Sequence, residues 1–296
     1  MKQILFRGAA TALVTPMQPD GSLDLETLSR LTEWQIQSSI SALVPCGTTG
    51  EAATLTDEER FTVIQTVAKT AAGRVPVIAG AGCNDTARAE QNCLAAAAAG
   101  ADALLLVTPY YNKCTPKGLQ SHFARLASAT PLPVILYNVP SRTGVTIDME
   151  SRRKLSKVDN IIGLKEASTD FSLIHQHLLE LGDTLPLYSG NDDLTLPLMS
   201  LGAHGCISVL SNLLPHSTEA LCQAILQNDL PAARSLHYSL LPLMKSLFCE
   251  VNPIPVKEAL AQMGMIEANY RMPLCPMADD TRSALTDALK GAGLLD

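Results

Sequence analysis

The sequence feature that most constrains the fold is a series of eight short apolar runs separated by segments with helical periodicity. The runs are nearly continuous in apolar character instead of alternating, which is typical of strands buried on both faces of a parallel sheet. They span residues 9–16, 42–46, 75–81, 103–109, 134–140, 161–167, 185–189 and 206–210. Eight such strands in one chain predict a large parallel sheet.

Amphipathic helical patterns fill the gaps between these runs. One of them begins with Thr56 and Glu59 in capping-box spacing, after which apolar residues recur on one helical face. The patterns span residues 23–36, 56–70, 86–99, 118–129, 149–155, 171–181 and 193–201. Strands that alternate with helices predict an α/β protein with a (β/α)8 TIM barrel. An open doubly wound sheet is the alternative fold.

The sequence after the eighth run contains more helix than one barrel needs. Four further helical segments span residues 217–227, 230–248, 256–263 and 279–290. A (β/α)8 barrel takes about 250 residues, so a chain of 296 residues has room for a tail. We expect a barrel of residues 1–216 and a C-terminal helical extension of residues 217–296 packed on it.

The composition argues against several classes of protein. A net charge of −7 disfavours a nucleic-acid partner, because such proteins need a clustered basic surface. No apolar run is long enough to span a membrane, and residues 1–7 lack the apolar core of a signal peptide. The eight cysteines form no C-x-x-C pair, so we predict free thiols in a cytoplasmic protein.

Polar residues at the C-terminal ends of barrel strands are the candidates for chemistry, because active sites of such barrels lie there. The second run is followed by Gly-Thr-Thr-Gly-Glu at residues 47–51. Its glycines let the backbone approach a ligand, and Thr48 and Thr49 with nearby N–H groups can hold a carboxylate. An ordinary Gly-Thr turn explains this loop equally well.

The fourth and fifth runs end in tyrosines, within Thr-Pro-Tyr-Tyr at 108–111 and Tyr-Asn-Val-Pro-Ser-Arg-Thr-Gly at 137–144. A phenol both donates and accepts hydrogen bonds, as proton transfer demands, although most tyrosines are simply half-buried aromatics. Arg142 is either a solvated loop residue or, through its planar fork, a binder of a substrate carboxylate.

Lys165 follows four residues that suit a buried strand. Lysines are rarely buried without a reason. Burial disfavours the charged form of an amine, and a neutral amine is the nucleophile that a carbonyl substrate needs. The alternative is a lysine that extends to solvent from a strand end. Lys257 is a rival, but it lies beyond the eighth run and has the position of a helix start.

Signals for a cofactor or metal are weak. The segment Gly80-Ala81-Gly82 lacks a third glycine at Asp85, so a dinucleotide fingerprint is not supported. His175 and His177 point to different faces of a predicted helix and make a poor metal pair. We expect neither a metal nor an organic cofactor.

The strand-end motifs together resemble the dihydrodipicolinate synthase family of pyruvate aldolases over almost the whole chain. The motifs are those at 47–51, 108–111 and 137–144, together with Gly-Leu-Lys-Glu-Ala at 163–167 and Asn-Pro-Ile-Pro-Val-Lys at 252–257. The resemblance implies a class I aldolase that condenses pyruvate with L-aspartate 4-semialdehyde to 4-hydroxy-tetrahydrodipicolinate, in the diaminopimelate and lysine pathway. It also implies a homotetramer built as a dimer of dimers.

The same resemblance implies a role for each site residue. Lys165 forms the imine with pyruvate, Tyr137 passes protons, and Thr48 completes a relay with Tyr111 of the neighbouring subunit. The substrate-binding residues implied are Thr49, Arg142, Gly190 and Ile207. Of these, Thr49 and the main chain at Ile207 hold pyruvate, and Arg142 receives the carboxylate of the semialdehyde.

Two other functions stay open. N-acetylneuraminate lyase and 2-keto-3-deoxy sugar acid aldolases share the lysine and the tyrosine, but generally differ where Thr49 or Arg142 stands. A catalytically silent barrel used for binding is disfavoured, because the lysine, the tyrosine and both relay residues are present.

Lysine-inhibited members of the family bind lysine in a cleft at the dimer interface, and its counterpart here differs in charge. The candidate effector cleft consists of Ala52, Ala53, Asn84, Arg88 and Tyr110. Asn84 and Tyr110 match the inhibited members, but Arg88 stands where they carry a glutamate, and Asp57 and Arg60 stand where histidine is common. A guanidinium repels an ammonium, so we expect weak or absent inhibition by lysine.

Overall fold

The computed structural model describes residues 2 and 4–296, whose eight strands form one parallel sheet. The strands are β1 (Gly8–Ala12), β2 (Ala42–Val44), β3 (Ile78–Gly80), β4 (Ala103–Val107), β5 (Val134–Asn138), β6 (Ile161–Glu166), β7 (Leu187–Ser189) and β8 (Gly205–Ser208). Their order is β2-β1-β8-β7-β6-β5-β4-β3, and a parallel bridge between Leu43 and Val77 brings the two ends of the sheet together. The predicted TIM barrel is therefore confirmed, and the open sheet is wrong.

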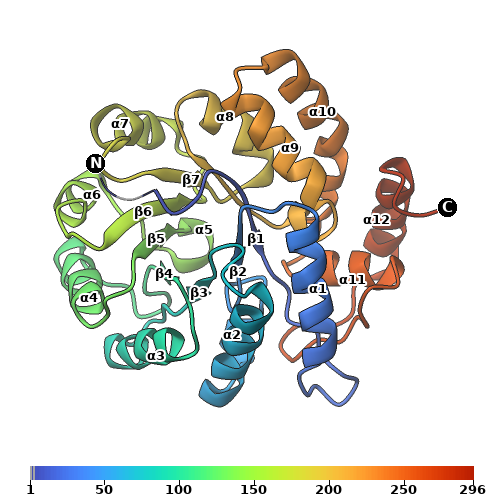
Figure 1. Cartoon of the computed structure of the whole chain (residues 1–296), viewed down its shortest axis with the longest axis horizontal. Helices are drawn as coiled ribbons and strands as arrows, with labels where there is room; N and C mark the ends of the chain where they lie inside the picture. Colours follow the sequence, from blue (N-terminus) through green and yellow to red (C-terminus); the bar gives the residue numbers. More distant parts are fainter. Residues whose placement is uncertain (1, 3) are drawn as a thin grey trace.

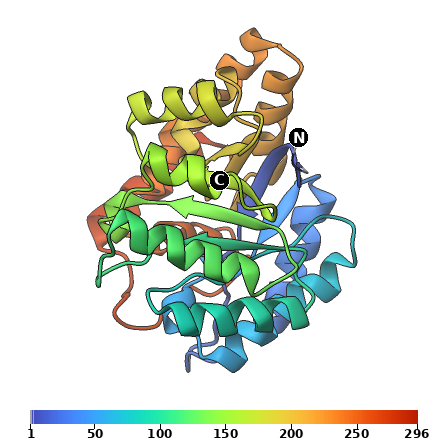
Figure 2. The same cartoon turned by 90° about the vertical axis from the view of Figure 1, so that its left-hand side faces the viewer.

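Helices surround the barrel and alternate with its strands (Figure 1, Figure 2). They are α1 (Leu25–Gln37), α2 (Asp57–Ala71), α3 (Thr86–Ala98), α4 (Pro116–Ser128), α5 (Pro140–Thr143), α6 (Met149–Leu155), α7 (Phe171–Leu181), α8 (Thr195–Ser200) and α9 (Pro215–Leu226). The capping box of Thr56 and Glu59 is present at the start of α2. The helix expected at 193–201 begins only at Thr195, because Pro197 has no N–H to donate to residue 193.

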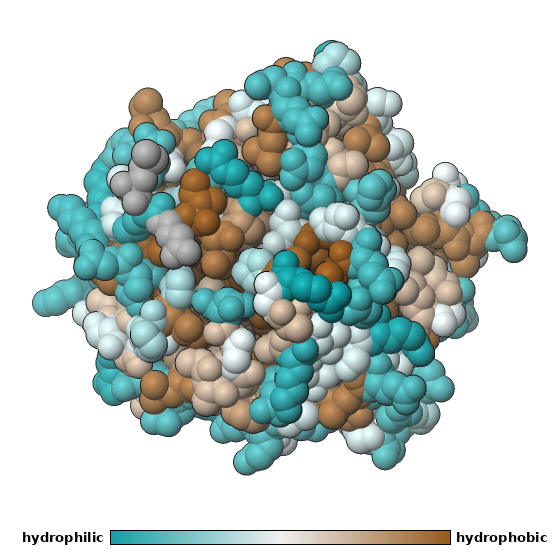
Figure 3. All heavy atoms as spheres, viewed as in Figure 1, coloured by the Kyte–Doolittle hydropathy of each residue, from teal (hydrophilic) through white to brown (hydrophobic). Residues whose placement is uncertain are grey.

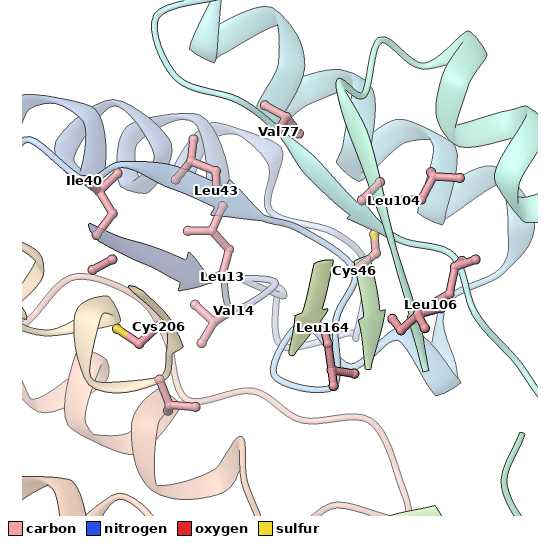
Figure 4. Close-up of a cluster of buried hydrophobic side chains, with 14 of the residues drawn as sticks. Leu13, Val14, Ile40, Leu43, Cys46, Val77, Leu104, Leu106, Leu164 and Cys206 are labelled. Atoms are coloured by element: carbon pink, nitrogen blue, oxygen red, sulfur yellow. The ribbon is translucent and has the colours of Figure 1, made fainter. Parts of the chain in front are cut away.

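Side chains on each strand alternate between two apolar cores, one inside the barrel and one beneath the helices. On β4, Leu105 belongs to the inner core, whereas Leu104 and Leu106 belong to the outer core. Figure 4 shows Leu104, Leu106 and Leu164 among the outer-core side chains. Since Leu164 faces outward, the next residue of β6, Lys165, projects into the barrel.

The C-terminal helices follow the eighth strand. After α9, which packs on β1 and α8, come α10 (Leu230–Ser246), α11 (Ile254–Gln262) and α12 (Asp279–Gly291). Helix α12 packs on α10 and α11. Arg30 of α1 donates a hydrogen bond of 2.9 Å to the carbonyl of Met265, which follows α11. The predicted helical extension thus packs on the barrel, and its boundary at residue 216 stays a prediction.

The surface is mixed in polarity. In Figure 3, hydrophilic side chains cover most of the rim of this face, and hydrophobic residues show in smaller patches between them. Within residues 2 and 4–296, every helix is too short or too polar to cross a membrane.

Candidate active site

Lys165 and Tyr137 lie side by side on the neighbouring strands β6 and β5. Their Cα atoms are register partners, and Nζ of Lys165 lies 4.3 Å from the centroid of the Tyr137 ring. Lys165 is only 6% exposed and Tyr137 only 7%. The predicted nucleophile and the predicted proton carrier are thus in contact inside the barrel.

A cavity of about 310 Å³ lies above this pair, at the C-terminal ends of the strands. We call it the Lys165 cavity. The predicted site residues in its wall are Thr48, Thr49, Tyr137, Arg142, Lys165 and Gly190. Ile207, also predicted to hold pyruvate, is fully buried in β8 and does not contribute to the wall. Six of the eight predicted catalytic and substrate-binding residues therefore meet at one cavity.

Gly190 follows β7 and leaves room for the lysine side chain. A Cβ atom at this position would lie 3.1 Å from Cε of Lys165 and 2.8 Å from Cβ of Ala167. Both approaches are closer than ordinary van der Waals contact. A larger residue at Gly190 would therefore displace Lys165.

A buried polar network lies behind Tyr137 and Lys165, on the outer face of the same strands. The next residues along β5 and β6 are Asn138 and Glu166, and Nδ2 of Asn138 donates to Oε1 of Glu166 at 2.8 Å. Arg152 of α6, fully buried, donates to Oε2 of the same carboxylate at 2.5 Å. Since both strand ends are tied to one carboxylate, the network holds the two predicted catalytic residues in register.

Arg142 lies on α5, a single helical turn directly after β5. Its neighbour Thr143 accepts a hydrogen bond of 2.9 Å from the hydroxyl of Thr108, which ties the turn to the end of β4. Nη2 of Arg142 donates to the main-chain carbonyl of Asn252 at 3.3 Å. The guanidinium is thus held at the cavity wall, and a substrate carboxylate there would meet a fixed positive charge.

Tyr111, a predicted catalytic residue, lies outside the Lys165 cavity of its own subunit. It is 92% exposed and does not contribute to the wall of the Lys165 cavity. Its backbone has φ of 68°, a conformation that is disfavoured for a bulky side chain.

A second cavity, of about 470 Å³, adjoins the first and shares Thr48, Tyr137 and Arg142 with it. We call it the Arg88 cleft. It is lined by all five predicted effector-cleft residues, namely Ala52, Ala53, Asn84, Arg88 and Tyr110.

Two arginines of the Arg88 cleft, Arg88 and Arg60, already have partners within the protein. Arg88 forms an ion pair of 3.0 Å with Asp57, with both side chains more than half exposed. Arg60, which we expected to alter the charge of the cleft, is buried and donates to the carbonyls of Gly80 and Ala52. Arg60 therefore supports the wall of the cleft, because its hydrogen bonds direct its guanidinium inward.

Lys257, the rival lysine, is fully buried in α11 and lines neither cavity. Its Nζ lies 2.6 Å from Oε1 of Glu51 and 3.3 Å from the carbonyl of Thr15. Burial lowers the pKa of Lys257, and Glu51 opposes that shift. The ion pair and the absence from both cavity walls exclude Lys257 as the group that meets a substrate.

The contacts of Lys257 and Asn252 were not predicted from the sequence. Both residues belong to the motif at 252–257, but their partners are Glu51 and Thr49 in the loop after β2. Neither spacing nor periodicity connects segments so far apart in the chain. The only signal in the sequence was that Asn252 and Lys257 belong to the same motif.

The model of the dihydrodipicolinate synthetase family matches residues 5–292. The chain belongs to this family. Two bacterial members named 4-hydroxy-tetrahydrodipicolinate synthase are similar throughout. The protein from Maridesulfovibrio salexigens is 45% identical over 98% of this chain and 99% of its own length. The protein from Exiguobacterium sibiricum is 47% identical over 97% and 98%, respectively.

A solved member of the dihydrodipicolinate synthetase family has the same fold. It is the dihydrodipicolinate synthase of Acinetobacter baumannii complexed with pyruvate, which is 43% identical to this chain. The TM-score is 0.96, and the match covers 98% of this chain and 99% of the solved one. The similarity therefore extends over barrel and C-terminal helices alike.

Proposed function

We propose that the protein condenses pyruvate with L-aspartate 4-semialdehyde to 4-hydroxy-tetrahydrodipicolinate, in the pathway to diaminopimelate and lysine. The observation that carries the proposal is the buried Lys165 beside Tyr137, beneath a cavity lined by Thr49 and Arg142. The names of the relatives and the pyruvate bound to the solved relative support the same substrates.

The first half of the reaction activates pyruvate. The amine of Lys165 attacks the keto carbon of pyruvate, and loss of water gives an imine. Thr49, in the wall of the Lys165 cavity, holds the pyruvate carboxylate during this step. Tyr137, in contact with Lys165, delivers and removes the protons, assisted by Thr48 and by Tyr111 of a second subunit.

In the second half, pyruvate is joined to L-aspartate 4-semialdehyde, the acceptor of the new carbon–carbon bond. Loss of a methyl proton converts the imine to an enamine, whose carbon attacks the aldehyde of the semialdehyde. The amino group of the acceptor then attacks the imine carbon, which closes the ring and releases Lys165. Arg142 binds the acceptor carboxylate through a charge-assisted hydrogen bond.

Borohydride trapping tests the chemistry directly. Reduction in the presence of pyruvate should fix one pyruvate-derived group on the peptide that contains Lys165. Lys165→Ala should abolish the adduct, whereas Lys257→Met should keep it in the folded fraction. An adduct on Lys257, or normal trapping by Lys165→Ala, would refute the assignment.

Product analysis tests whether aspartate semialdehyde is the second substrate. Pyruvate with aspartate semialdehyde should give the cyclic product. Cleavage of N-acetylneuraminate or of a 2-keto-3-deoxy sugar acid instead, with no cyclic product, would favour a sister aldolase.

The proposed relay requires at least a dimer, and we extend the proposal to a homotetramer in the cytoplasm. The exposure of Tyr111 and its absence from its own cavity support a shared site. The eight free cysteines are consistent with a reducing compartment.

Subunit mixing tests the shared site. Lys165→Ala and Tyr111→Phe, each weakly active alone, should regain about a quarter of wild-type activity when dissociated and reassembled in equal amounts, since half of the dimers then hold one intact site. Recovery of no activity on mixing would contradict the shared site.

A further inference from the structure

Asn252 stands at the junction of the two halves of the proposed substrate site. It lies in the segment between α10 and α11, is 6% exposed, and lines both the Lys165 cavity and the Arg88 cleft. Its side chain and its main chain contact different residues. Nδ2 donates to Oγ1 of Thr49 at 3.0 Å, and the carbonyl accepts from Nη2 of Arg142 at 3.3 Å.

The contact with Thr49 determines whether the threonine hydroxyl is free to donate or only to accept a further hydrogen bond. A hydroxyl group has one proton to donate and two lone pairs to accept with. Because the Asn252 amide donates to Oγ1, it occupies a lone pair and leaves the proton of Thr49 free. Within residues 2 and 4–296, Asn252 is the side chain that hydrogen-bonds this hydroxyl.

The free proton is what the proposed substrate needs. A carboxylate can only accept hydrogen bonds. A threonine hydroxyl that donates its proton elsewhere would present lone pairs to the pyruvate carboxylate and repel it. We infer that Asn252 is a positioning residue, which makes the Thr49 hydroxyl a donor to the carboxylate of pyruvate. The inference rests on the proposed function and adds a pyruvate-selecting residue from the C-terminal extension to it.

The main-chain contact allows a specific effect of the Asn252 side chain to be distinguished from a general loss of structure. Substitution of Asn252 removes the amide but keeps the carbonyl that orients Arg142. The side chain therefore serves the pyruvate half of the site alone. A change at Asn252 should affect pyruvate and leave the semialdehyde largely unaffected.

Steady-state kinetics of Asn252→Ala with each substrate varied in turn test this division. Without the amide the Thr49 hydroxyl is no longer held as a donor, and its weakened hydrogen bond to the charged carboxylate should raise the KM for pyruvate about tenfold. The KM for semialdehyde should stay within about twofold of wild type. Asn269→Ala is the matched control, because Asn269 lies in the same extension and its Nδ2 donates to the Met17 carbonyl at 3.0 Å. This control should keep the wild-type KM for pyruvate.

Asn252→Asp, which preserves side-chain volume, provides a second and independent variant. Its carboxylate would accept the Thr49 proton and add a negative charge near the pyruvate carboxylate. The KM for pyruvate should therefore rise further than in Asn252→Ala. This variant decides the matter if Asn252→Ala does not fold.

A double-mutant cycle with Thr49→Val gives the decisive comparison. If Asn252 acts through the Thr49 hydroxyl, adding Asn252→Ala to Thr49→Val should produce no further rise in the KM for pyruvate. Additive effects, or an equal rise for both substrates, would overturn the inference. Absence of a trapped imine in the wild type would instead refute the proposed function itself, and the role of Asn252 with it.

Discussion

Lys257 and Glu51 form a fully buried ion pair, with 2.6 Å between Nζ and Oε1, although they lie 206 residues apart in the chain. The pair joins α11 to the loop that carries Thr48 and Thr49. The main-chain N–H of Arg271 contacts the same carboxylate at 3.5 Å. The C-terminal extension therefore forms part of the support of the active-site loop.

Loss of one partner should be costly, because it leaves the other charge buried and unpaired. We expect Lys257→Met to lower the free energy of unfolding by about 3–5 kcal/mol. Adding Glu51→Gln should recover part of the loss. Urea denaturation measures both. The exposed pair of Lys154 and Glu150 is the control, since Lys154→Met should change stability by less than about 1 kcal/mol. Equal losses in the two lysine variants would contradict the expectation.

Arg142→Ala should impair use of the semialdehyde rather than capture of pyruvate. The loss of a charge-assisted contact costs roughly 1.5–3 kcal/mol, or about a ten- to hundredfold rise in the KM for semialdehyde. Borohydride trapping of pyruvate alone should proceed at the wild-type rate. Equal damage to imine formation would show that Arg142 also serves pyruvate.

L-lysine should inhibit the protein weakly or not at all. The carboxylate of Asp57 is already paired with Arg88, so it offers a lysine ammonium little attraction, and the guanidinium of Arg88 repels that ammonium. Titration of L-lysine against the initial rate at near-saturating pyruvate measures this. Half-inhibition below about 1 mM, a binding free energy beyond roughly −4 kcal/mol, would contradict the prediction.

Two buried histidines should make the fold sensitive to acid. Burial lowers the pKa of His122 to about 4, and burial together with Arg152 lowers the pKa of His177 to about 4. An unfolded histidine titrates near 6.5, so between these values the unfolded chain binds more protons than the folded one. Stability is therefore complete above about pH 6.5 and is lost as the pH falls toward about 4, by roughly 3 kcal/mol for each histidine.

Urea denaturation of His122→Gln at pH 7 and pH 4.5 tests this dependence. The variant should lose less stability than wild type between the two pH values. His216, which is exposed, provides the control, since His216→Gln should follow the wild-type profile. A variant profile identical to that of wild type would show that His122 does not contribute.

Much of the barrel was predictable from short stretches of sequence. All eight strands lie within or next to the predicted apolar runs, and α6 and α7 have the predicted bounds. Most strands are shorter than the runs because the last residues of a run turn into the following loop, whereas β7 begins two residues after its run does. Cys46, for example, has φ of 55° and lies beyond β2.

The position of Lys165 was also predictable, since an isolated lysine at the end of an apolar strand projects into a barrel or to its mouth. The same holds for Tyr137, near the end of β5, and for Arg142, in the turn that follows β5. These assignments need only the period of a strand and the rule that barrel strands present their C-terminal ends to one common mouth.

The contacts of the C-terminal extension could be decided only by the tertiary structure. Local patterns specify which residues of a helix or strand are buried, but not which distant segment covers them. The docking of the extension onto the barrel brings Asn252 to Thr49 and Lys257 to Glu51. It thereby determines that Lys257 is a structural charge and Lys165 the lysine that a substrate can reach, because burial against a carboxylate and burial beneath a cavity look alike in sequence.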